Sequence, residues 1–191
     1  GLTRLADLAA ARGDVASAQA LYEQSQAISE GLSRADPENT GYRRDVALGL
    51  TRLADLAAAR GDVASAQALC EQSQALFEEV SRADPDNPGY RRDVAVGQAR
   101  LADLAAARGD VASAQALYEQ SQAISEGLSR ADPENTGYRR DVALGLTRLA
   151  DLAAARGDVA SAQALYEQSQ AISEGLSRAD PENTGEHRVP P

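Results

Sequence analysis

The sequence repeats itself with a fixed period of 48 residues. The stretch "GLTRLADLAAARGD" begins at Gly1, Gly49 and Gly145, and the variant "GQARLADLAAARGD" begins at Gly97. A fixed period in this range is typical of solenoids, in which each repeat is one supersecondary element that must stack on its neighbours to bury its apolar face. The period therefore predicts a single repeat array over 1–191. Its repeats are 1–48, 49–96, 97–144 and 145–191.

Helix start and stop signals divide each repeat into two helices. The Gly-Asp pair at 61–62 indicates a C-terminal glycine followed by the N-cap of the next helix. The motif "SRADPEN" is the second stop, in which Pro37 ends one helix and Asn39 caps the next. We expect the first helix of the second repeat at about 40–60 and its second helix at about 63–83.

Apolar residues recur at helical spacing along both segments and predict one buried stripe on each helix. The stripe of the first helix comprises Val46, Gly49, Leu50, Leu53, Leu56 and Ala57; that of the second comprises Ala18, Leu21, Tyr22, Ser25, Ile28 and Leu32. Gly49, Gly97 and Gly145 fall inside helices, where a glycine costs about 1 kcal/mol relative to alanine. Close approach by a neighbouring helix would explain them, and so would a mild kink.

Composition limits the classes of function. All 19 basic residues are arginine, and 29 acidic residues give a net charge of -10. Nucleic acid is not an expected partner, because phosphate binding needs a surplus of cations. No apolar run approaches the roughly 20 residues that span a bilayer, so no membrane contact is predicted. The lone Cys70 cannot form an internal disulfide, which favours a cytoplasmic location, and the absence of methionine suggests a piece of a longer protein.

The motif "LADLAAARGDVASAQALYEQS" resembles the tetratricopeptide repeat (TPR). The matching positions in the second repeat are Leu53, Ala54, Gly61, Asp62, Ala66 and the closing Pro85, with Cys70 where the other repeats have tyrosine. A period of 48 residues corresponds to a repeat of about 34 residues extended by two insertions of about seven. The resemblance implies an all-α fold, an α-solenoid of stacked antiparallel helix pairs wound into a right-handed superhelix.

Little in the sequence points to catalysis. His187 is the one histidine and lies in "EHRVPP", beyond the last helix pair, so we expect neither a metal site nor a Ser-His-Asp arrangement. Cys70 replaces a tyrosine of the buried stripe and is interpreted as an inert core residue. The Asp-Arg pairs at helical spacing are typical of solvated faces. The sequence therefore predicts a protein that is not an enzyme and needs no cofactor or metal.

Charged residues recur on the first helices in two rows. The aspartate row is Asp7, Asp55, Asp103 and Asp151, and the arginine row three residues earlier is Arg4, Arg52, Arg100 and Arg148. These rows form either intrahelical pairs or part of a binding surface. In the TPR family the concave groove is lined mainly by the first helices. By that resemblance the candidate lining is Arg44, Leu48, Thr51, Asp55, Ala58, Arg92, Val96, Ala99, Asp103, Ala106, Arg140, Leu144, Thr147, Asp151 and Ala154.

Two functions are compatible with these features. The first is a non-catalytic scaffold whose groove binds an extended or helical segment of a protein or peptide ligand. The second is a structural spacer or self-assembling rod that stacks end to end. Near-identity of the repeats favours the second, because a specific peptide site needs different residues in successive repeats. Stacking also requires exposed ends, and we expect the last second helix to expose Tyr166, Ile172 and Leu176 or their neighbours.

Overall fold

A computed structural model describes residues 1–179 of the chain. Helices hold 86% of these residues, and the described part contains no strand. His187 and the "EHRVPP" segment, on which the sequence analysis comments, lie outside the described residues. The all-α prediction is confirmed.

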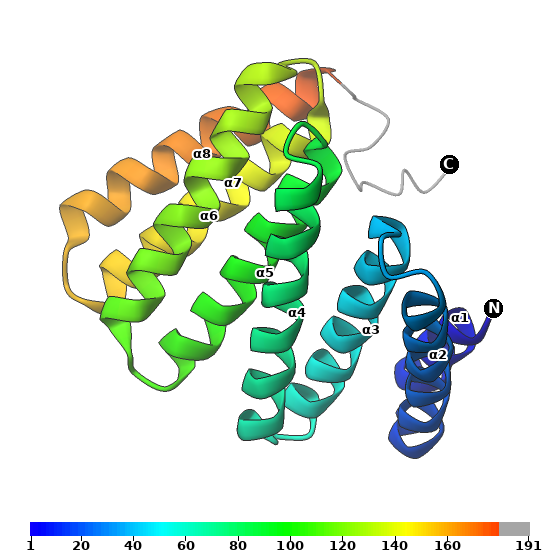
Figure 1. Cartoon of the computed structure of the whole chain (residues 1–191). Coiled ribbons are helices and arrows are strands. Elements are labelled where there is room, and N and C mark those ends of the chain that lie inside the picture. Colours follow the sequence, from blue (N-terminus) through cyan, green and yellow to red (C-terminus); the bar gives the residue numbers. More distant parts are fainter. Residues whose placement is uncertain (180–191) are drawn as a thin grey trace, which may run out of the picture. The chain divides into compact units, whose positions relative to one another are not determined.

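Each period of 48 residues corresponds to two helices. The boundaries at 48/49, 96/97 and 144/145 fall inside α3, α5 and α7, and we call each of these the first helix of the later repeat and the helix after it the second helix. The first helices are α1 (Leu2–Ala11), α3 (Thr40–Ala59), α5 (Pro88–Ala107) and α7 (Thr136–Ala155), and the second helices are α2 (Val15–Ala35), α4 (Val63–Ala83), α6 (Val111–Ala131) and α8 (Val159–Ala179). The predicted helices at 40–60 and 63–83 agree with α3 and α4 to within one residue. Within α1 to α4, and again within α6 to α8, consecutive helices run antiparallel (Figure 1).

The helix ends follow the predicted local chemistry. Gly61 has a φ of +78°, which a residue with a side chain rarely adopts, and it lets the chain turn after α3. The Asp62 carboxylate then accepts a hydrogen bond of 3.1 Å from the Ser65 backbone amide and caps α4. Asn39 caps α3 by accepting from the Tyr42 amide at 3.2 Å. These bonds satisfy amides that have no partner inside the helix.

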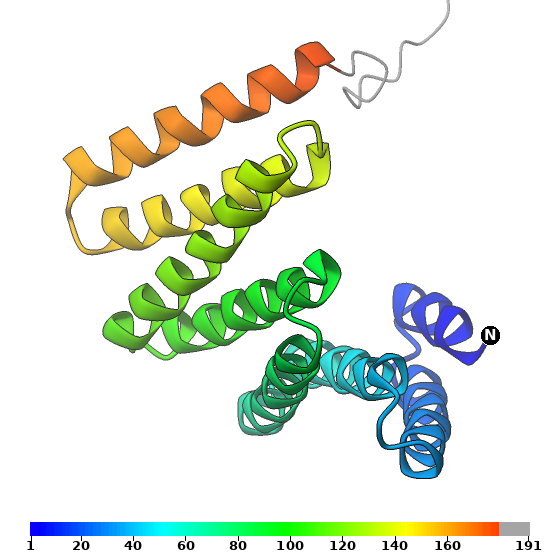
Figure 2. The same ribbon diagram turned by 45° about the horizontal axis from the view of Figure 1, so that its top comes forward.

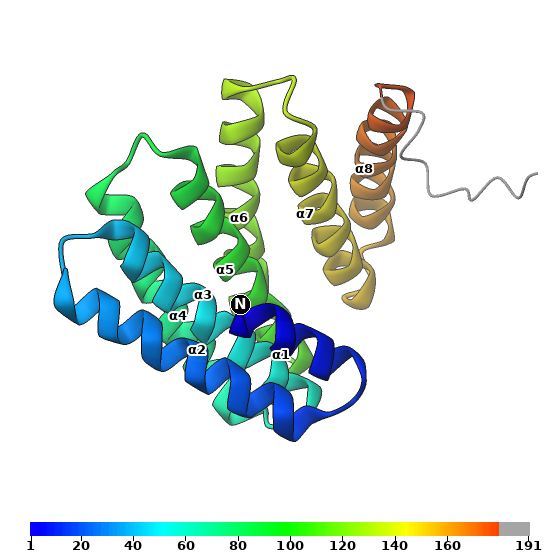
Figure 3. The same ribbon diagram turned by 90° about the vertical axis from the view of Figure 1, so that its right-hand side faces the viewer.

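The helices gather into two compact units, Gly1–Leu104 and the described part of Ala105–Pro191, with the division inside α5. In the first unit α1 packs on α2, α2 on α3, and α3 on α4 (Figure 2). In the second unit α7 lies between α6 and α8 and packs on both (Figure 3). Each unit is therefore built from stacked antiparallel helix pairs. The division into four repeats of one array stays a prediction.

Small side chains dominate the core. Ala6, Ala18, Tyr22 and Leu56 form one buried cluster in the first unit, and it draws on α1, α2 and α3. Alanine allows the helices of a pair to approach closely, while Leu56, which belongs to the second repeat, covers the tyrosine of the first. A repeat thus completes its core with a residue from its neighbour, as expected for a stacked array.

The buried stripe of α2 is shorter than predicted. Leu32 is 43% exposed, whereas its equivalent Val80 in α4 is 1% exposed. Ile28 is exposed as well. The reason is the length of the helix that covers each stripe, because α1 has 10 residues and α3 has 20. Since α1 runs antiparallel to α2, it covers only the N-terminal half of α2.

Candidate interaction surface

The first helices of the unit Gly1–Leu104 share a concave surface. One hollow on it has a volume of about 440 Å³ and draws its lining from α1, α2, α3 and α5. We call it the first-helix hollow, and it is lined by Asp7, Ala10, Tyr22, Leu48, Thr51, Arg52, Asp55, Leu56, Ala59 and Arg100. A second hollow of about 560 Å³ shares Asp7, Leu48 and Arg52 with it. Leu48, Thr51 and Asp55 were predicted as groove residues from the sequence.

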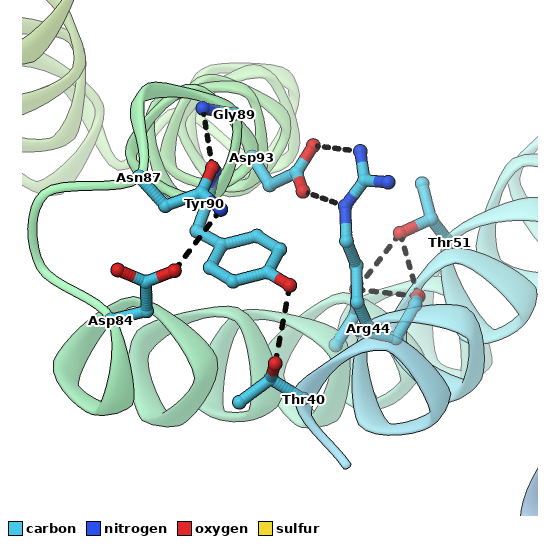
Figure 4. A network of polar contacts seen from close by, with 10 residues as sticks. Thr40, Arg44, Thr51, Asp84, Asn87, Gly89, Tyr90 and Asp93 are labelled. Carbon is cyan, nitrogen blue, oxygen red and sulfur yellow. Dashed lines mark hydrogen bonds and ion pairs between the residues drawn. The ribbon is translucent and has the colours of Figure 1, made fainter.

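An ion pair joins neighbouring first helices beside this hollow. The Arg44 guanidinium donates from Nη2 to Asp93 Oδ1 at 3.1 Å and from Nε to the other carboxylate oxygen (Figure 4). The hydrogen bond to Asp93 raises the pKa of the Arg44 guanidinium above its ordinary value, while burial acts in the opposite direction. Tyr90 and Thr40 are hydrogen-bonded through their hydroxyls at 3.2 Å in the same network. Arg44 therefore ties α3 to α5 through a two-point contact.

The aspartate row finds partners on other helices. Tyr22 donates its hydroxyl proton to Asp7 Oδ1 at 2.6 Å, and Tyr166 donates to Asp151 in the same way. Burial raises the pKa of Tyr22 to about 12, with a further contribution from the hydrogen bond to Asp7. In the second repeat Cys70 stands where the tyrosine would be, and Asp55 pairs with Arg100 of α5 instead. Replacing one tyrosine thus frees a carboxylate to connect two repeats.

The other predicted groove residues divide into packed and exposed positions. Thr51 and Thr147 are hydrogen-bonded to Ser73 and Ser169 of their own repeats, at 2.8 and 2.9 Å, and Ala99 is buried. These three pack between helices. Among the remainder, Val96 and Leu144 are exposed apolar residues, and Leu48 is half-buried at the equivalent position. The rest are Ala58, Arg92, Asp103, Arg140 and Ala154, which are exposed, and Ala106, which is half-buried.

Sequence reasoning missed the glutamines that contact the helix-interior glycines. A Cβ atom on Gly49 would lie 1.9 Å from Oε1 of Gln26, and one on Gly145 would lie 2.0 Å from Oε1 of Gln122. The predicted close approach is confirmed, but a buried side chain makes it. The signal was present in the sequence, since Gln26, Gln74 and Gln122 precede Gly49, Gly97 and Gly145 by the same interval.

The chemistry of the remaining side chains is limited. Cys70 is a buried free thiol, and burial raises its pKa, so little reactive thiolate forms at neutral pH. Over residues 1–179 the structure brings no group of three His, Cys, Asp or Glu side chains into an arrangement that could hold a metal ion. None of the eight described helices is both long and apolar enough to cross a membrane.

The architecture defines the class of protein. Antiparallel helix pairs that recur with a fixed period and share their core across repeats are the fold of the TPR-like repeat proteins. No protein-family description matches the sequence, and no curated protein matches it.

Solved structures agree with this fold. The chain is similar to BtubC (BKLC) from P. vanneervenii, with a TM-score of 0.69 and 21% sequence identity over 100% of this chain. It spans 66% of the length of that protein. It is also similar to a variant of the Podosopora anserina "putative kinesin light chain nearly identical TPR-like repeats". There the TM-score is 0.51 and the identity 23%, covering 93% of this chain and 95% of that one. The interpretation of the 48-residue repeat as a lengthened TPR stays a prediction.

Proposed function

We propose that the chain is a non-catalytic interaction scaffold that binds an extended or helical segment of another protein on its first helices. The observation that carries this proposal is the first-helix hollow, where α1, α3 and α5 line one concave surface of Gly1–Leu104. The helices are held in place by their own packing and by the Arg44–Asp93 pair. Binding then requires ordering of the ligand alone, which favours affinity. The net charge of -10 argues against nucleic acid as a partner.

The residues of the hollow indicate which ligand groups would fit. Leu48, Leu56 and Ala10 offer apolar contact, while Asp7 and Asp55 already have partners. Among the described residues the Arg52 guanidinium has no hydrogen bond or ion pair. The ligand segment is therefore expected to place an acidic group against Arg52 and an apolar side chain against Leu48.

Selection from a random peptide library on the immobilised chain tests the scaffold. Selected peptides are expected to carry an acidic residue beside an apolar one, and Arg52→Glu is expected to weaken their binding about tenfold. Arg82→Glu, an exposed arginine of α4 outside the hollow, is the matched control and should change binding less than about twofold. Failure to select any peptide, or equal loss with both variants, would contradict binding in this hollow.

A second candidate function is self-association, in which the chain is a structural spacer that stacks end to end. Tyr166 of α8 is 40% exposed, whereas the equivalent Tyr22 and Tyr118 are 9% and 6% exposed under the next first helix. Apolar surface of this kind is stabilised by a further packed helix. Light scattering over a concentration series is expected to show a rising mass. A constant monomeric mass at about 1 mM, where weak contacts form, would exclude this candidate.

A further inference from the structure

Two side-chain contacts recur where α2 meets α3 and where α6 meets α7, and a third is formed between α2 and α3. Between α2 and α3, Tyr22 packs on Leu56 and Gln26 lies against Gly49. At the C-terminal end of α3, Arg60 Nη1 donates to Oε1 of Gln19.

Between α6 and α7 two of these contacts recur with residues of the same type. Gln122 lies against Gly145, and Arg156 donates to Gln115. We call the whole set the junction contacts. Each junction has two halves. The residues of the second helix form the second-helix half, and the residues of the next first helix form the first-helix half.

Both halves of a junction are exposed in this chain. The sequence of α8 is identical to those of α2 and α6, and its Tyr166, Gln170 and Gln163 are exposed. The ten residues of α1 are identical to the last ten of α3 and α7. Leu8 of α1 is 55% exposed, whereas its equivalent Leu56 is 8% exposed. Among residues 1–179 no helix covers this face of α8, and it thus matches the face of α1 that carries Leu8.

We propose that a second copy of the chain fills this junction by docking its α1 on α8. Equivalence with the internal junctions sets the register. Leu8 of one copy lies on Tyr166 of the other, Gly1 lies against Gln170, and Arg12 donates to Oε1 of Gln163. This oxygen is available, because the Gln163 amide group uses its Nε2 to donate to Glu167 at 2.8 Å. The inference rests on the second candidate function and specifies its contact.

The occupant is a second copy because its α1 presents the residue types that the junction requires. Gln26 and Gln122 are buried, and their Oε1 atoms have no hydrogen-bond partner among the described residues, so the first helix must place a glycine there. A helix with a larger residue at that position would clash with the amide. The contact is heterologous, so a pair of copies keeps one α1 and one α8 exposed and continues to grow.

Variants of the two halves test this register in the full chain. Gln170→Arg places a cation opposite the positive N-terminal end of α1, and Leu8→Arg removes the apolar contact to Tyr166. Both residues are exposed, and circular dichroism of each variant checks that the fold is retained. Gln168→Arg is the matched control, because Gln24, Gln72 and Gln168 are exposed in their repeats and lie outside the junction contacts.

Sedimentation velocity is expected to show that Gln170→Arg and Leu8→Arg each weaken self-association about tenfold or more, while Gln168→Arg changes it less than about twofold. An equimolar mixture of the two junction variants has one intact half from each, so it should form a one-to-one dimer that does not grow. A strictly monomeric wild-type chain would overturn both self-association and this register. Self-association that neither variant weakens, or a mixture that stays monomeric, would overturn the register alone.

Discussion

The contact between a buried glutamine and a helix-interior glycine is the feature at residue scale with the sharpest consequence. Gln26 is buried in α2 and donates from Nε2 to Glu30 at 3.2 Å, while its Oε1 lies against the backbone of Gly49. Glycine is unfavourable in a helix, so the position is explained by the space that the amide oxygen occupies.

Gly49→Ala is therefore expected to destabilise the chain although alanine is the better helix former. Gly31→Ala is the matched control, since nothing lies within 4 Å of a Cβ there, and it should stabilise by up to about 1 kcal/mol. Chemical denaturation measures both effects. Adding Gln26→Ala to Gly49→Ala should recover part of the loss, because it removes the clashing amide. Equal stabilisation by both glycine substitutions would show that the glutamine contact is unimportant.

The aspartate N-caps make stability depend on pH. The hydrogen bonds from Ser65 lower the pKa of Asp62, and the same holds for Asp14, Asp110 and Asp158 with their own serines. A pKa that is lower in the folded state means that the stabilisation is complete above the unfolded pKa of about 4 and is lost as the pH falls through the folded value.

Replacing all four cap aspartates by asparagine should reduce the loss of stability on acidification. Asparagine keeps an oxygen that accepts from the backbone amide, but it does not titrate. The measurement is the melting temperature of both chains between about pH 6 and pH 3, the range over which aspartates titrate. An identical fall in both chains would mean that other carboxylates cause the acid sensitivity.

At the scale of elements, α4 differs from the other second helices at five positions, and the differences at Cys70, Phe77 and Glu79 have a structural account. Glu79 replaces a glycine and accepts from Arg43 at 2.5 Å, which adds an ion pair between α3 and α4. Phe77 replaces a serine and is 4% exposed. Cys70 and Phe77 lie seven residues apart on one face of α4. Compared with the other second helices, this face therefore has a smaller residue at position 70 and a larger one at position 77.

Phe77→Ser should destabilise the chain by about 3 kcal/mol or more, because it removes a buried aromatic ring and leaves a cavity. The expectation holds even though the equivalent Ser125 is buried in α6, where it donates to the Ser121 carbonyl at 3.1 Å. Phe77→Leu, which keeps most of the apolar volume, should lose less than half as much in the same denaturation experiment. A loss below about 1 kcal/mol for the serine variant would mean that the ring contributes little to packing.

At the scale of the whole molecule, the repeating junction contacts predict that stability is a sum over repeats and their interfaces. Deletion of residues 97–144 removes one period and joins Val96 to Gly145, which leaves a glycine at the position that Gln74 contacts. The shortened chain should keep its helical circular dichroism per residue and melt at a lower temperature. Deletion of about half a period breaks the alternation of first and second helices. The helices next to such a deletion should therefore unfold. Complete unfolding by the 48-residue deletion would indicate one indivisible core.

The sequence by itself determined the helices, their ends and the order in which they pack. Caps such as Asp62 and turns such as Gly61 act through bonds that span a few residues, so they can be recognised without a structure. The repeat period identified the class of fold for the same reason, because identical segments form identical helix pairs. Leu48 and Asp55, which line the first-helix hollow, were candidate groove residues from the sequence, since position along a first helix fixes which face a residue occupies; their role in binding stays a prediction.

Only the tertiary structure decided which side chains meet. Arg44 and Asp93 pair across 49 positions of the chain, and Thr51, which lines the first-helix hollow, is also hydrogen-bonded to Ser73. The length of the covering helix decides how deeply a residue is buried, as Leu32, exposed beyond the short α1, shows. Repeated residues have the same local preferences in every copy. The residues that pack against them in space differ from repeat to repeat, and this packing sets how deeply each residue is buried and which hydrogen-bond partner it has.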